Sequence, residues 1–147
     1  MNQEPQGAVG SHSQGDTLAD ALACLSSAFI SANGVNPSFY REAGGALVKH
    51  GHVSLNTETK RISRNSENRI WQFLIDRSFP RGEYVARLVA KRICLAIDQI
   101  NDAGGDEFVR QLVKSDKESA KMLLMPLYGM GPKSFEIYWS LAIKSSS

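Results

Sequence analysis

The strongest chemical signal in this sequence is the stretch LYGMGPKSFEIYW, which begins at residue 127. Glycine permits a positive φ and close backbone approach, and proline suits the first position of a helix. The stretch therefore predicts a tight turn between two helices, with unpaired backbone amides at the turn and at the start of the second helix. Such amides, at the positive end of a helix dipole, bind anions. The predicted anion site comprises Gly129, Met130, Gly131, Lys133 and Ser134, with the Met130 side chain expected to point inward and hold the two helices together.

The order of residues across this turn resembles the helix-hairpin-helix DNA-binding motif. Its core is a hydrophobic residue, any residue, Gly, a hydrophobic residue and Gly, often followed by Pro-Lys. The matching positions are Leu127, Gly129, Met130, Gly131, Pro132 and Lys133. In that family the hairpin amides grip a DNA phosphate, so the resemblance implies this role for residues 117–142. Two positions depart from the pattern: Pro126 predicts a lost hydrogen bond or a kink at the end of the first helix, and Phe135 is bulkier than the usual small residue.

A second stretch, NGVNPSFY at residues 33–40, lines up with YGMGPKSF at residues 128–135. Gly34 then matches the first glycine of the turn and Asn36 replaces the second. Asn is the next-best residue for a positive φ, so the turn would survive that change. The pattern fits either a degenerate second hairpin or ordinary helix capping before Pro37.

The middle of the chain is locally basic. Residues 60–92 carry nine Lys or Arg side chains against three acidic ones, although the net charge of the whole chain is only +2. Such a block is either a solvated helix face or a contact surface for a phosphate backbone. We expect Lys60, Arg61 and Arg64 to extend the DNA contact of the turn.

Residues 46–64, ALVKHGHVSLNTETKRISR, resemble the end of the recognition helix and the β-wing of winged-helix regulators. The resemblance implies phosphate contacts by the basic residues of this segment, which are Lys49, His50, Lys60, Arg61 and Arg64. A winged helix needs two helices before the wing, and only one is predicted between Gly34 and His50.

The sequence gives little support for a catalytic site or a metal site. The three histidines, His12, His50 and His52, form neither a ligand set nor a triad, and no phosphate-binding loop is present. Cys24 and Cys94 lie in apolar helical patterns and are predicted to be reduced core thiols. The segment AGGDEF at residues 103–108 resembles the diguanylate cyclase signature, but its helical surroundings favour a helix cap. We expect no enzyme, no cofactor and no metal.

The apolar periodicity predicts an all-α, compact multi-helix domain over residues 17–147, with a disordered tail at residues 1–16. Helices are expected at 17–32, 37–50, 66–78, 80–101, 105–114, 117–127 and 132–144, with a short β-hairpin near 53–62. The aromatic residues Trp71, Phe73, Tyr138 and Trp139 lie on or beside apolar stripes, so core burial is expected rather than base stacking.

These features favour a protein that binds the DNA backbone without reading bases. No apolar window is long enough to span a membrane and no signal peptide begins the sequence, so a cytoplasmic location is expected, and a nucleoid-associated one if the protein binds DNA. One alternative is a helical protein–protein adaptor or inhibitor with a basic face for an acidic partner. The other is a winged-helix-like transcriptional regulator. A protein partner and a homodimer both stay open.

Overall fold

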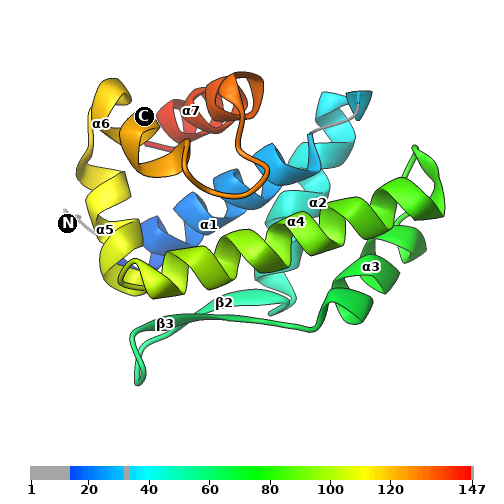
Figure 1. Ribbon diagram of the computed structural model, residues 1–147, viewed down its shortest axis with the longest axis horizontal. Helices are drawn as coiled ribbons and strands as arrows, with labels where there is room; N and C mark the ends of the chain where they lie inside the picture. The colour runs from blue at the N-terminus through cyan, green and yellow to red at the C-terminus, as the bar shows by residue number, and fades with distance from the viewer. Residues whose placement is uncertain (1–13, 32–33, 147) are drawn as a thin grey trace, which may run out of the picture.

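The computed structural model describes residues 14–31 and 34–146 and is mostly helical (Figure 1). In chain order the elements are α1 (Gln14–Ile30), α2 (Pro37–Lys49), β2 (Val53–Asn56), β3 (Arg61–Arg64), α3 (Glu67–Asp76), α4 (Gly82–Asp102), α5 (Asp106–Lys114), α6 (Lys117–Leu124) and α7 (Pro132–Ser146). The predicted all-α fold with one β-hairpin is confirmed. Helix α1 already begins at Gln14, inside the expected tail, whereas residues 1–13 lie outside the described part of the chain. Among the described helices, none is long and apolar enough to cross a membrane.

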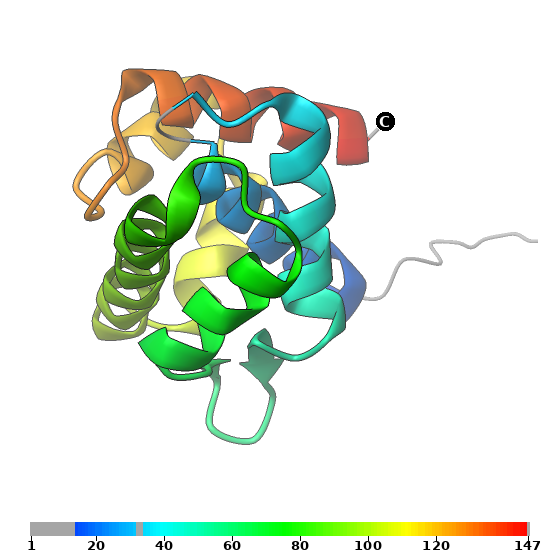
Figure 2. The same ribbon diagram turned by 90° about the vertical axis from the view of Figure 1, so that its right-hand side faces the viewer.

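Helix α1 forms the centre of the molecule. It packs against α2, α4, α5, α7 and β2, and Figures 1 and 2 show it enclosed between α4, α2 and α7. The apolar residues Leu18, Leu22, Leu25 and Phe29 of this helix are all buried. The structure also buries its serine positions, with Ser26 and Ser27 each only 3% exposed. Small side chains on the remaining faces let neighbouring helices approach α1 from several sides.

Helices α1 and α2 are in close contact at Gly44. A Cβ added there would collide with both the side chain and the backbone of Ser27. By contrast, a Cβ added at the neighbouring Gly45 would meet nothing within 4 Å. The α1–α2 contact therefore depends on the missing side chain at one glycine and not at the other.

The β-hairpin is fastened to the C-terminal half of α4. Strands β2 and β3 pair antiparallel with Leu55 opposite Ile62, and Val53 and Ile62 point into the core at 0% and 2% exposure. The side chain of Asn101 in α4 accepts a hydrogen bond from the Ile62 amide at 2.8 Å and donates one to its carbonyl at 2.9 Å. Asn101 thus satisfies the backbone of β3 on the side away from β2, which holds the hairpin in place.

Candidate nucleic-acid interface

The turn before α7 spans residues 125–131, so it is longer than the sequence predicted. Helix α6 was expected to run to Leu127 but ends at Leu124. Pro126 is the reason, because proline has no amide hydrogen and its ring clashes with the preceding helical turn. The departure from the motif noted at Pro126 therefore lengthens the connection between the two helices. Helix α7 begins at Pro132, as predicted.

Amides of this 125–131 turn are already hydrogen-bonded, one of them within the turn and another to α4. The Met130 amide donates to the Leu127 carbonyl at 3.1 Å, and the Tyr128 amide donates to Oε1 of Gln99 in α4 at 2.5 Å. Met130 is only 5% exposed and Leu127 only 6%. Met130 was predicted to belong to the anion site. Its amide is used and therefore does not belong to that site, whereas its side chain is buried, as expected, and anchors the turn.

Other amides around the turn stay open. Within the described residues, the amides of Gly129, Gly131, Lys133 and Ser134 have no hydrogen-bond acceptor. The helical ladder of α7 starts only with the Phe135 amide, which donates to the Gly131 carbonyl at 2.9 Å. Gly131 precedes α7 and has no side chain with which to cap it. These four positions of the predicted site therefore keep free donors at the positive end of a helix.

Lys133 adds a full charge next to these donors. Its side chain is exposed, and it forms no ion pair with any residue that the structure describes. The nearest acidic residue along α7, Glu136, is paired with Lys117 of α6 at 3.0 Å. The electrostatic attraction of the site for an anion is therefore not cancelled by an ion pair at Lys133.

Arg92 of α4 is a second cation at the turn, and the sequence did not single it out. Gly129 has φ +80°, and a Cβ added to it would overlap the Arg92 stem, with Nε at 2.7 Å. The guanidinium donates to the Phe29 carbonyl at 3.3 Å and forms no ion pair with a described carboxylate. Burial lowers the pKa of Arg92. The sequence does contain a signal that could have identified Arg92. Its helical spacing from Gln99 puts both residues on the same face of α4, which is the face that meets the turn.

The Gly34–Pro37 segment reproduces the backbone pattern of the 125–131 turn. Gly34 has φ +76°, Val35 is 6% exposed, and Pro37 starts α2. Asn36, however, has φ −72°, so the match does not depend on the tolerance of Asn for positive φ. Its side chain accepts a hydrogen bond from the Phe39 amide at 2.9 Å and caps α2. The segment is therefore a capped helix start in which the Asn36 side chain closes the amide of Phe39, the position equivalent to Ser134, and Asn33 lies outside the described residues.

The basic residues of the hairpin do not lie with the turn. Figures 1 and 2 place β2 and β3 at the opposite end of the molecule from residues 125–131, with α4 between them. Arg64 is held by Asp98 through two hydrogen bonds of 2.9 and 3.0 Å, which also raise its pKa. Lys60 and Arg61 are exposed and form no ion pair with a described residue. Lys60, Arg61 and Arg64 therefore do not form one continuous surface with the turn, and a contact between them and DNA stays a prediction.

Other basic residues of the 60–92 block also form ion pairs with acidic residues of the same chain. Arg77 pairs with Glu42 at 2.7 Å, and Arg87 lies 3.9 Å from Glu67. Ion pairing of this kind reduces the positive potential that a partner would meet. The block is thus a weaker electrostatic surface than its composition predicts.

The aromatic residues do not form a stacking platform. The Arg87 guanidinium lies 4.3 Å from the centre of the Trp71 ring, and that of Arg77 lies 4.6 Å from the Phe73 ring. Tyr138 is 2% exposed, and Trp139 packs on Phe135. Tyr138 is buried in the core, as the sequence predicted. Trp71, Phe73 and Trp139 are only partly buried against the core.

A shallow groove continues from the turn along α7. It has a volume of about 300 Å³ and lies between α2 and α7. Its lining includes Lys133 together with Arg41, Lys144 and Glu136. Three cationic side chains against one carboxylate give this groove a positive lining.

Comparison with known proteins returned no matching protein-family model, no matching curated protein and no matching solved structure.

Proposed function

We propose that this protein binds the DNA backbone through the start of α7 and the 125–131 turn. The observation that carries the proposal is the set of open amides at Gly129, Gly131, Lys133 and Ser134, which have no acceptor in the described residues. A phosphate oxygen is the natural acceptor for such donors at the positive end of a helix. Sequence-independent binding follows, because the backbone carries no base information.

Two cations support the same proposal. Lys133 is exposed beside the amides, and Arg92 lies against Gly129 without an acidic partner among the described residues. The groove between α2 and α7 then offers Arg41 for the neighbouring phosphate. With only a few phosphates neutralised, we expect modest affinity, with a log–log salt slope of about −2 to −3.

The test is a titration of a fluorescently labelled duplex at several salt concentrations, comparing Lys133→Gln with Lys60→Gln. Both substitutions remove one exposed lysine charge, but Lys60 lies in the hairpin at the other end of the molecule. We expect Lys133→Gln to weaken binding and to reduce the salt slope by about one, with Lys60→Gln close to the unchanged protein.

Gly131→Ala tests the access to the amides directly. A Cβ at this position meets nothing within 4 Å, so the fold tolerates it, but the added methyl group narrows the approach to the amide of residue 131 itself. We expect weaker duplex binding with an unchanged circular dichroism spectrum.

The opposite results point to the alternatives. If Lys60→Gln weakens binding and Lys133→Gln does not, the hairpin is the contact surface and the winged-helix-like regulator is favoured. If the protein does not bind a duplex at low salt, the proposal is wrong. The adaptor is then favoured by recovery of one stoichiometric protein partner that resists nuclease treatment.

A further inference from the structure

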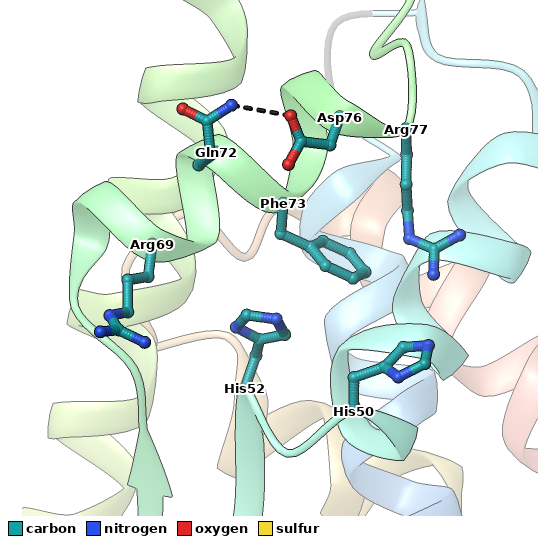
Figure 3. A pocket seen from close by; sticks show the side chains of 7 residues that line it. All are labelled: His50, His52, Arg69, Gln72, Phe73, Asp76 and Arg77. Carbon is teal, nitrogen blue, oxygen red and sulfur yellow. Dashed lines mark hydrogen bonds between the residues drawn. The ribbon is translucent and has the colours of Figure 1, made fainter.

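A second candidate site lies on another part of the molecule and uses none of the residues of the DNA proposal. It is a hollow of about 610 Å³ at the point where the end of α2 and the start of β2 face α3. We call it the His–Arg hollow; its lining residues are His50, His52, Arg69, Gln72, Phe73, Asp76 and Arg77. Figure 3 shows the two histidines along one side, with Arg69 and Arg77 on either flank of Phe73.

The hydrogen bonding of His52 fixes which ring nitrogen carries the proton. The side-chain amide nitrogen of Asn65 lies 2.8 Å from Nδ1 of His52. An amide nitrogen can only donate, so Nδ1 accepts and the neutral ring carries its hydrogen on Nε2. His52 therefore contributes a donor in addition to those of the arginines.

The electrostatic environment of His52 is positive. Burial lowers its pKa, and so do the charges of His50, Arg69 and Arg77. Groups on two helices thus direct positive potential onto the same ring. An anion placed among them would relieve this repulsion.

Arg69 is the cation that remains available for a ligand. It is exposed and forms no ion pair with a described residue, whereas Arg77 is held by Glu42 at 2.7 Å. The acidic residue of the lining, Asp76, accepts a hydrogen bond from Gln72 at 2.7 Å and lies across the hollow from the histidines (Figure 3). The histidine side of the hollow therefore presents donors without a carboxylate.

The aromatic ring in the hollow is already in use. His52 packs on Phe73 with ring centres 4.8 Å apart, and Arg77 lies over the ring at 4.6 Å. A ligand that needs to stack on Phe73 is disfavoured, and a ligand that accepts hydrogen bonds is favoured. Arginine and histidine donors together suit the oxygen atoms of a phosphate group.

We propose that the His–Arg hollow binds a phosphate group, held by Arg69 and His52 with support from His50. The volume of the hollow is in the range of small-molecule sites, so it has room for the rest of a phosphorylated compound. The same chemistry would accept a phosphate of a nucleic-acid backbone, and the experiment separates these two sources.

The experiment follows the ring-proton NMR signals of His50 and His52 during titration with inorganic phosphate at pH 6.5 and low salt. His50→Gln and His52→Gln assign the two signals. We expect saturable shifts of both, and an upward shift of the His52 pKa in the presence of phosphate. Arg69→Gln should weaken phosphate binding by about tenfold. Lys91→Gln is the matched control, because it removes an exposed α4 charge that does not line the hollow.

A phosphomonoester and a short DNA duplex are then titrated in the same way. Shifts that saturate with the monoester support a small phosphorylated ligand, and shifts that saturate with the duplex and weaken in Arg69→Gln support a backbone phosphate. The proposal is overturned if phosphate leaves both signals unmoved, or if Arg69→Gln and Lys91→Gln weaken binding equally. Circular dichroism of Arg69→Gln checks that the fold is intact.

Discussion

Replacing the two glycines of the 125–131 turn with alanine should have opposite effects on stability. Gly129 has φ +80°, where an alanine costs about 1–2 kcal/mol. A Cβ there would also overlap the Arg92 stem, so Arg92 must move and weaken its hydrogen bond to the Phe29 carbonyl. Together these effects should lower the free energy of unfolding by about 2–4 kcal/mol. Gly131 has no positive φ and open space around it, so alanine should stabilise by about 0.4–1 kcal/mol through the unfolded state.

Urea unfolding followed by tryptophan fluorescence measures both changes. The Arg92→Ala background separates the two contributions at Gly129, because removing the arginine stem leaves only the backbone cost of about 1–2 kcal/mol. Equal unfolding midpoints for Gly129→Ala and Gly131→Ala would refute the geometry of the turn. So would a cost at Gly129 that Arg92→Ala leaves unchanged, since the clash would then not exist.

Two further predictions concern the core and the pH dependence. Gly44→Ala should destabilise the protein by about 2 kcal/mol or more because its Cβ collides with Ser27. Gly45→Ala should instead stabilise it by about 0.5–1 kcal/mol, and equal thermal midpoints would contradict the close α1–α2 approach. Because the folded pKa of His52 lies below its ordinary value of 6.5, stability should be full above pH 6.5 and decline as the pH falls through the lowered pKa. His52→Gln should reduce this decline between pH 7.5 and 5.5 in urea unfolding; the same decline in both proteins would show that His52 is not responsible.

The site itself was only partly predictable. The sequence predicted open amides at Gly129, Gly131, Lys133 and Ser134. Two glycines before a proline produce a turn and a helix start whose amides are unpaired, and this depends only on the local backbone. The sequence placed the Met130 amide in the same site and the Met130 side chain in the core; the side chain is buried as predicted, but the amide is used within the turn. Arg92 went unnoticed because its contact with Gly129 joins residues far apart in the chain.

The sequence by itself determined the helices, the hairpin and the glycine turn, because these depend on periodicity, capping and proline within a few residues. For example, Asn36 caps the start of α2 and Pro126 ends α6, and both effects depend only on residues close by in the sequence. Only the tertiary structure decided which charges remain available. It paired Arg64 with Asp98 and placed the hairpin far from the turn. It also brought His52 and Arg69 together in one hollow. Such pairings depend on how helices pack across the core, and no spacing along the chain encodes the distance between two side chains on different elements.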